Sequence, residues 1–293
     1  MNWDDVRIFL AVARAGQILG AARRLGINHA TVSRRVAALE QALGAKLFQR
    51  LTTGTELTAA GQHFLPVAER METDMIAARA DLAGEGDEIA GTVRIGAPDG
   101  FGVAYLAPRL GDLTARYRDL TIQLVPVPRS FSLSRREADI AITVERPAEG
   151  RLVAGKLVDY SLGLYASHAY LERHGRPGST DELAGHSLIG YVEDLIINPS
   201  LDYADEFWRD WKTNYAVSSA LGQVEAVRAG AGIGILHTFI ARALPELVLL
   251  DAAPPIRRAY WLVYHESVRP MRRIQVVSSF ISELVEKERA LFL

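Results

Sequence analysis

The sequence contains no cysteine among its 293 residues. Neither disulfide bonds nor thiolate metal sites can therefore hold this fold, and a reducing compartment, the cytoplasm, is the natural expectation. The sequence also lacks a run of about 18 apolar residues, the length that a membrane-spanning helix needs. Its first residues, MNWDD, include two acids and are not followed by the apolar core of a signal peptide. We therefore expect neither export nor a membrane span.

Motifs of catalysis and of metal binding are missing as well. The seven histidines form no HExxH pair, and the sequence contains no GxSxG nucleophile motif. The glycine-rich segment 230–234 follows a predicted helix and precedes a predicted strand, the reverse of the order in a dinucleotide-binding loop. We therefore expect a turn at this segment, no metal, no cofactor and no enzymatic activity.

Charge is distributed unevenly along the chain. Residues 1–61 contain eight Lys and Arg against four Asp and Glu, which gives this segment a charge of +4. Because the net charge of the whole chain is −2, the remaining residues together carry −6. A basic segment on an acidic body suggests that one end of the protein meets a polyanion. An ordinary fluctuation of charge along a chain is the alternative interpretation.

Three short helices are predicted in the basic segment. Asn2 can cap a first helix that ends at Gly16, and an alanine-rich second helix runs from about residue 18 to 25. Gly26 then suits a tight turn, and Asn28 can cap a third helix. The third helix has apolar residues at i, i+4 and i+7, namely Val32, Val36 and Leu39. Two short helices joined by a glycine turn have the geometry of a helix-turn-helix, whose second helix enters the DNA major groove.

A small wing is predicted after the third helix. Residues 43–50 and 52–58 suit two short strands, and Arg50 is placed to meet phosphate or the minor groove. Residues 58–61 then cap a long helix.

This segment resembles the DNA-binding domain of LysR-type transcriptional regulators, almost without gaps. The motifs that carry the resemblance are FLAVARAG at 9–16, AARRLG at 21–26, TVSRRVAALE at 31–40, LG at 43–44, LFQR at 47–50 and LTAAG at 57–61. The resemblance implies that DNA bases are faced by His29, Ala30, Thr31 and Arg34. It places Ser33, Arg35 and Arg50 on the phosphate backbone. For Arg34 and Arg35, the alternative is a solvated helix face.

Two positions depart from the family pattern. The second helix begins with QILG at 17–20, where relatives usually have a pair of Ser or Thr residues, so a hydroxyl cap is missing. His29 stands where a glutamine is common, which should alter the base preference.

The long helix has a heptad seam. Phe64, Ala68, Met71, Met75, Ala78 and Leu82 are spaced by four and three residues in alternation. A helix from Ala59 to about Ala83 would be about 37 Å long, enough to separate two DNA-binding heads by about one turn of DNA. We expect a homodimer or homotetramer; the alternative is a helix that lies on its own chain's core. Pro66 removes a backbone donor, and residues 84–88 suit a flexible boundary.

The rest of the chain alternates β-rich and helical segments, which predicts a doubly wound α/β sheet. Strands are expected at 93–95, 121–125, 139–143, 163–166, 188–191, 233–236 and 260–264. The order resembles the effector domain of the same regulators, a two-lobed fold similar to type 2 periplasmic binding proteins. The resemblance implies crossings between the lobes near 143–162 and near residue 265.

Three loops suit a ligand site, because ligands of such sheets bind beyond the strand ends, at helix N-termini. They are 97–101, 143–145 and 218–223. By resemblance they line the cleft between the lobes, with Tyr191 as a fourth contributor outside the three loops. The effector-binding residues are then Asp99, Gly100, Phe101, Thr143, Glu145, Tyr191, Ser219 and Gly222. Many relatives have a Ser or Thr at Asp99 that binds an effector carboxylate, so Asp99 and Glu145 favour an effector with an amine or several hydroxyls. The alternative is that Asp99 caps the following helix.

The sequence thus predicts a transcriptional regulator with three parts. They are a winged helix-turn-helix at 1–58, a linker and dimerisation helix at 59–90, and an effector domain at 91–293, with lobe I at about 91–161 and 266–293 and lobe II at about 162–265. Expected partners are double-stranded DNA, a small-molecule effector and a second copy, with RNA polymerase a further candidate. The rival interpretation is a solute-binding or enzymatic α/β protein whose first helices serve only for dimerisation. That interpretation leaves the basic excess unexplained.

Overall fold

The computed structural model describes residues 2–51, 54–82, 89–127, 138–147, 151–196 and 203–293. The chain forms two compact units, one built mainly from the first 88 residues and the other from most of the remaining chain.

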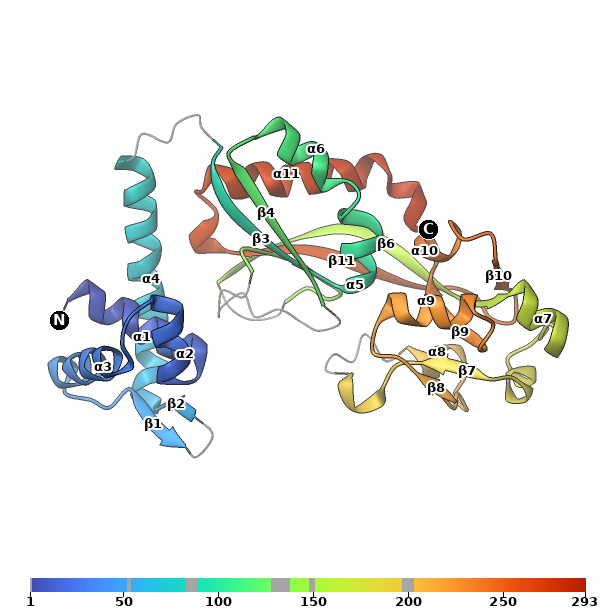
Figure 1. The fold of residues 1–293 in the computed structure, drawn as a ribbon, viewed down its shortest axis with the longest axis horizontal. Coiled ribbons are helices and arrows are strands. Elements are labelled where there is room, and N and C mark those ends of the chain that lie inside the picture. Colours follow the sequence, from blue (N-terminus) through green and yellow to red (C-terminus); the bar gives the residue numbers. More distant parts are fainter. Residues whose placement is uncertain (1, 52–53, 83–88, 128–137, 148–150, 197–202) are drawn as a thin grey trace. The chain divides into compact units, whose positions relative to one another are not determined.

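The N-terminal unit contains the three short helices, the wing and the long helix that the sequence predicts (Figure 1). Its elements are α1 (Trp3–Ala15), α2 (Ile18–Leu25), α3 (His29–Leu43), β1 (Phe48–Leu51), β2 (Gly54–Leu57) and α4 (Ala59–Leu82). Asn2 caps α1 in a capping box with Asp5, as the sequence suggests for a polar residue before an apolar helix. Gly16 ends α1 in the left-handed conformation, at a φ of 65°.

Two apolar cores hold these helices together. The first joins α1, α2 and α3 and includes Ile8, Val12, Ala21, Val32 and Val36. The second joins α1 and α3 to the wing and to α4, and includes Phe9, Leu10, Leu39, Leu47 and Ala68. Both faces of α1 are therefore buried, which makes it the central helix of the unit.

The first half of the heptad seam packs within this unit. Ala68 is fully buried, and Phe64 and Met71 pack against the second core. The rings of Phe9 and Phe64 lie 5.1 Å apart. In this half of α4, the structure therefore shows the alternative interpretation, a helix that lies on the core of its own chain. Met75 is exposed, and the side chains of Ala78 and Leu82 lie outside the described residues.

The C-terminal unit alternates strands with short helices. Its strands are β3 (Gly91–Ala97), β4 (Leu120–Pro126), β5 (Ile140–Thr143), β6 (Leu152–Ser167), β7 (Leu188–Gly190), β8 (Tyr215–Ala216), β9 (Ile233–His237), β10 (Leu247–Leu250) and β11 (Ile256–His265). Its α-helices are α5 (Asp99–Phe101), α6 (Leu110–Arg116), α7 (His168–His174), α8 (Ala204–Phe207), α9 (Ala220–Arg228), α10 (Thr238–Ala241) and α11 (Arg272–Lys287). A π-helical turn covers Gly102–Leu106, and 3-10 turns cover Asp181–Gly185, Glu193–Leu195, Glu266–Val268 and Arg289–Phe292.

The strands described form one mixed sheet in the order β4-β3-β5-β11-β6-β9-β7-β8, with β10 beside β6. β3 runs parallel to β4 and β5 at one end, and β7 runs parallel to β8 and β9 at the other. The long strands β6 and β11 lie antiparallel between the two ends and connect them (Figure 1). The α/β class and the two-ended arrangement are confirmed.

The crossing between the two ends is more regular than the sequence predicts. The sequence indicates a strand only at residues 163–166, whereas β6 is a continuous strand of 16 residues that begins at Leu152. Each half of β6 is buried by a different set of neighbours, so no single periodicity marks its whole length. The short strands β8 and β10 were also not predicted.

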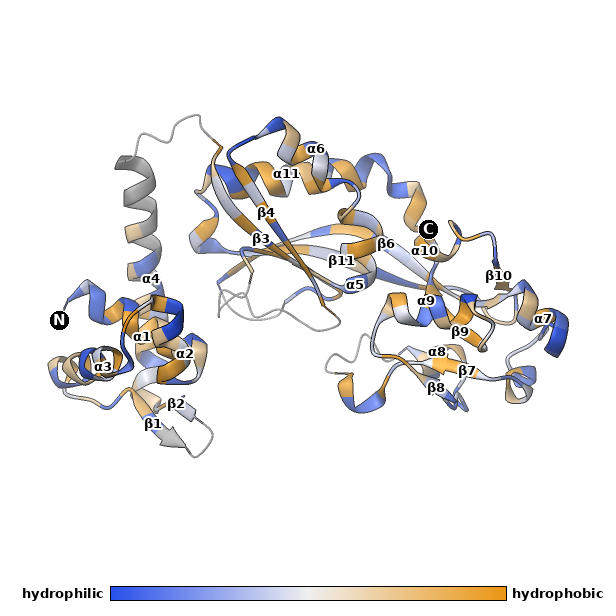
Figure 2. Cartoon of the chain, in the orientation of Figure 1, coloured by the Kyte–Doolittle hydropathy of each residue, from blue (hydrophilic) through white to orange (hydrophobic). Residues whose placement is uncertain are grey.

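Helix α11 covers part of this sheet with one face. Ile274, Val277, Ile281 and Val285 are buried at helical spacing, and hydrophilic and hydrophobic stretches alternate along the helix (Figure 2). The glycine-rich segment forms the predicted turn between α9 and β9, where Gly230 has a φ of 78°.

Candidate DNA-binding and effector sites

Helices α2 and α3 form the predicted helix-turn-helix. Gly26 ends α2 at a φ of 66°, and the Asn28 side chain accepts a hydrogen bond of 2.9 Å from the backbone N–H of Ala30. Val32 and Val36 anchor α3 in the core. His29, Ala30 and Arg34 are exposed, whereas Thr31 and Ser33 are half-buried. The start of α3 therefore presents an unobstructed polar face within this unit.

Arg35 has a different environment from its neighbour. Its guanidinium lies 3.0 Å from Asp5 Oδ1 and 3.6 Å from Asp4 Oδ2, and so ties α3 to the start of α1. Asp5 also accepts from the backbone N–H of Asn2. If Arg35 contacts phosphate, its N–H groups must be divided between the phosphate and these two acids. The sequence did not indicate these ion pairs.

The wing is joined to the helices by backbone contacts. The N–H of Thr55 donates to the carbonyl of Gly16 over 2.8 Å, so β2 lies against the end of α1. Arg50 is in β1 and pairs with Thr55 in the register of the hairpin. The Arg50 side chain lies outside the described residues.

Two buried acids support this unit and were missed from the sequence. Glu40 accepts hydrogen bonds from Lys46 and from the backbone N–H groups of Leu47 and Phe48, which fixes the start of the wing. Burial raises the pKa of Glu40, but these donors outweigh burial and hold it below its ordinary value. Glu72 on α4 forms a two-fold ion pair with Arg14 on α1, with contacts of 2.6 and 3.2 Å.

In the C-terminal unit, Asp99 connects the two ends of the sheet. It begins α5, directly after β3, and is 8% exposed. Its Oδ2 atom accepts a 2.5 Å hydrogen bond from the Ser219 hydroxyl and a 3.3 Å hydrogen bond from the N–H of Leu221. Among the described residues its side chain accepts from Ser219 and Leu221 and not from α5, which contradicts the alternative role of capping the following helix. It caps α9 instead.

Ser219 and two glycines complete this junction. The Ser219 hydroxyl donates to Asp99 and accepts from the N–H of Gly222, as the N-cap of α9. A Cβ at Gly100 would lie 3.3 Å from Ala220 and from Ile240, so glycine permits this close approach. The structure thus brings Asp99, Gly100, Ser219 and Gly222 together.

The other predicted effector residues have different positions. Phe101 is fully buried, with its ring 4.6 Å from that of Tyr260. Thr143 ends β5 and donates to the carbonyl of Glu145, whose side chain is exposed. Tyr191 follows β7 and is half-buried. Burial, and next the negative charge of Asp99, raise the pKa of Tyr191.

Further aromatic residues pack beside α5, the helix that Asp99 begins, and were not predicted. Tyr160 stacks on Tyr260 at 4.1 Å and on His237 at 5.3 Å. Burial raises the pKa of Tyr203 and Tyr260, and nearby tyrosines and Asp99 raise it further. Burial lowers the pKa of His237 to about 4, against the opposing effect of Asp99, so its imidazole is neutral near pH 7. These residues come from distant segments, so no sequence spacing could join them.

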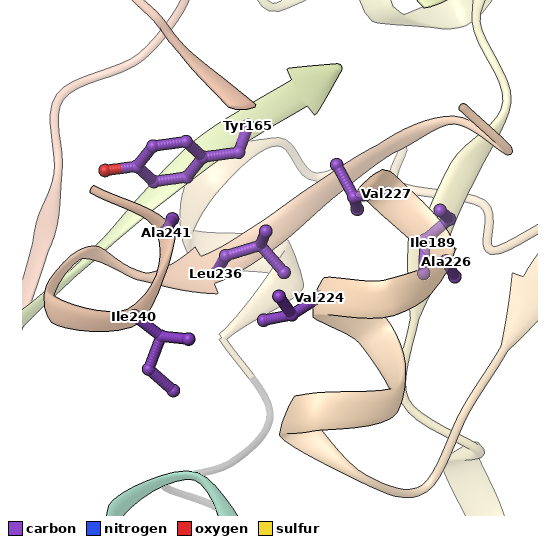
Figure 3. Close-up of a cluster of buried hydrophobic side chains, with 8 residues drawn as sticks. All are labelled: Tyr165, Ile189, Val224, Ala226, Val227, Leu236, Ile240 and Ala241. Carbon is purple, nitrogen blue, oxygen red and sulfur yellow. The ribbon is translucent and has the colours of Figure 1, made fainter. Parts of the chain in front are cut away.

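Helix α9 packs at this junction through an apolar cluster. Val224, Ala226 and Val227 on α9 face Leu236 of β9 and Ile189 of β7, with Tyr165, Ile240 and Ala241 beside them (Figure 3). The cluster fixes the position of the helix N-terminus that Asp99 meets.

The described residues offer neither a metal site nor a membrane span. No group of three or more His, Asp or Glu side chains among them is arranged to hold a metal ion. No helix in the described part of the chain is both long and apolar enough to cross a membrane.

These features define a winged helix-turn-helix protein with a two-ended α/β domain. Residues 3–62 match the family described as "Bacterial regulatory helix-turn-helix protein, lysR family", and residues 86–286 match the LysR substrate binding domain. The chain belongs to the LysR family of transcriptional regulators.

Named relatives agree over nearly the whole chain. The chain is 28% identical to the HTH-type transcriptional regulator CrgA of Neisseria meningitidis, over 96% of both proteins. The CrgA structure matches with a TM-score of 0.61, covering 97% of this chain and 98% of that one. A full-length OxyR variant from Pseudomonas aeruginosa shares the fold at a TM-score of 0.70 and 22% identity, over 96% of this chain and 94% of that one. Corynebacterium glutamicum LysG, whose structure holds the effector Arg, shares it at a TM-score of 0.66 and 22% identity, over 98% and 99%.

Proposed function

We propose that this protein is a sequence-specific DNA-binding transcriptional regulator whose DNA binding or promoter activation is modulated by a small molecule. The effector binds between the two ends of the C-terminal domain. The exposed start of α3, fixed by two cores and followed by a wing, is the observation that carries the DNA-binding part. The hydrogen bonds from Ser219 and Leu221 to Asp99 support the effector part, because a ligand there would contact both ends of the domain.

In this proposal phosphate contacts supply most of the affinity, and His29, Ala30, Thr31 and Arg34 supply the choice of bases. Ser33 and Arg50 contact the phosphate backbone of the DNA. Arg35 also contacts it, through the N–H groups that are not used in its ion pairs with Asp4 and Asp5. Two or four copies assemble through α4, on which Met75 is exposed, so that paired heads read two half-sites. The protein acts in the cytoplasm without catalysis, and RNA polymerase is a further proposed partner.

The effector changes the balance between two arrangements of the domain. It can do so only by binding one arrangement more tightly than the other. The Arg bound to LysG shows that one protein of this fold holds a small molecule.

The test is binding of the purified protein to DNA fragments from its own genome, starting upstream of its own gene, across a salt series. We expect sequence-selective binding above a nonspecific background of roughly 10⁻⁴ to 10⁻⁶ M, weakening steeply with salt. Weak and unselective binding to every fragment by a folded protein would favour the rival, a ligand-binding protein without an operator.

A further inference from the structure

The N-terminus of α9 already holds a carboxylate, that of Asp99. A helix N-terminus favours anions because its backbone N–H groups are unpaired and its dipole is positive there. The Ser219 hydroxyl and the Leu221 N–H both donate to Asp99 Oδ2. A ligand carboxylate at this place would have to displace Asp99 from these donors and would meet its negative charge.

Asp99 nevertheless lacks a compensating cation. Among the described residues, no Lys or Arg forms an ion pair with Asp99, and Oδ1 accepts no hydrogen bond, although the residue is only 8% exposed. His237 is near enough to feel this charge but is neutral near pH 7. A buried carboxylate without a cation is costly, and a positive ligand would remove that cost.

The surroundings of Asp99 suit a cation rather than a second anion. Tyr191 and Tyr203 lie within range of the Asp99 charge, and the face of a tyrosine ring attracts cations. Tyr191 and Ser219 are half-buried, so the site is not sealed from solvent.

We propose that the site at Asp99 takes a cationic ligand, an alkylammonium or a guanidinium compound, and rejects carboxylates of the same size. This inference rests on the proposed function, because it names the ligand class of the same site. Asp99 Oδ1 accepts the hydrogen bond from the cation, while Oδ2 keeps α9 in place.

The test uses four probes with one carbon skeleton: butylammonium, butylguanidinium, butanol and butyrate. Each is titrated into the full-length protein at constant ionic strength and followed by calorimetry and by thermal unfolding. We expect one of the two cations to bind at least about tenfold more tightly than butanol and butyrate. Tighter binding of butanol or butyrate, or no binding by any probe, would overturn the inference.

Two variants locate the binding. Asp99→Asn removes the charge but keeps the shape, and should weaken cation binding at least about tenfold. Asp99→Ser frees the donors of α9, and should let butyrate bind. Glu225→Gln is the matched control, since it removes the same charge from an exposed position of α9.

Cation binding that is unchanged in Asp99→Asn would contradict the assignment to this site. Thermal unfolding without ligand shows whether each variant is folded. Binding to the DNA fragments is also measured without any probe. This measurement distinguishes a failure of the present inference from a failure of the proposed function. Selective DNA binding with a site that prefers butyrate overturns this inference alone, whereas the loss of selective DNA binding overturns the proposed function.

Discussion

Arg34 and Arg35 are adjacent in sequence but face different surroundings. Arg35 is tied to Asp4 and Asp5 of α1, while Arg34 projects from the exposed face of α3. Their substitution should therefore affect different properties, with Arg35→Ala acting on stability as well as on DNA binding.

Arg34→Ala should weaken binding to the selected operator by about 1–3 kcal/mol, because a bidentate base contact is lost. The free energy of unfolding should stay the same, since the side chain is exposed. Fluorescence anisotropy with labelled operator measures the affinity, and urea unfolding measures the stability. Arg209→Ala is the control, an exposed arginine of the C-terminal unit. Equal effects of the two substitutions on operator binding would contradict the role of Arg34.

His237 should make stability depend on pH. Its pKa of about 4 in the folded protein lies below the ordinary value of 6.5, so the unfolded chain binds more protons between these values. Stability is therefore fully present above pH 6.5 and falls as the pH drops to 4, by roughly 3 kcal/mol from this group.

The measurement is urea unfolding across this pH range for the wild type, His237→Gln and His63→Gln. His237→Gln should flatten the pH dependence, whereas His63→Gln, at an exposed position, should leave it unchanged. A pH slope that persists in His237→Gln would assign the effect to other groups.

At the scale of elements, the start of α4 is fitted closely to the wing. The Thr58 hydroxyl donates to the carbonyl of Lys46 and accepts from the N–H of Gly61. A Cβ at Gly61 would overlap the carbonyl oxygen of Leu47 and approach Leu57 to 2.9 Å. The glycine of the LTAAG motif is thus explained by contact between helix and wing.

Gly61→Ala should destabilise the protein by about 1–3 kcal/mol, because the wing or α4 must shift. It should also weaken operator binding, since Arg50 lies on the wing. Gly111→Ala provides the matched control, as a Cβ there meets nothing within 4 Å and alanine favours the helix. Calorimetric unfolding compares the stability of the two variants. An unchanged stability of Gly61→Ala would contradict the prediction, because it would show that the backbone of Leu47 and the side chain of Leu57 move aside at little cost.

At the scale of the whole molecule, the proposed assembly depends on the residues of α4 that follow Met71, the last residue of the seam that packs in its own unit. Ala68 belongs to the core of its own unit, whereas Met75 is 41% exposed, so an apolar side chain is left for a second copy.

Met75→Glu should shift the protein toward smaller oligomers and lower its operator affinity, because a charge is placed in an apolar helix pairing. Light scattering after size-exclusion chromatography measures the mass at several concentrations. Leu195→Glu makes the same change at another exposed apolar residue and should not alter the mass. An unchanged mass for Met75→Glu would exclude this surface from assembly.

Much of the fold was predictable from local signals. Asn2, Gly16, Gly26 and Asn28 act within one turn of the chain, so their capping roles can be derived from the sequence, and the structure confirms them. The course of β6 was not predictable, because its two halves are buried by strands distant in sequence.

The sequence alone determined the family, the helix-turn-helix, the wing and the α/β class, because helical periodicity, caps and turn residues act over short distances. Only the tertiary structure decided how Asp99 is used. Its bond to Ser219 spans 120 residues, and the surrounding Tyr160, Tyr260 and His237 come from other strands. The same reason separates Arg34 from Arg35, since burial and ion pairs depend on which helices meet in space.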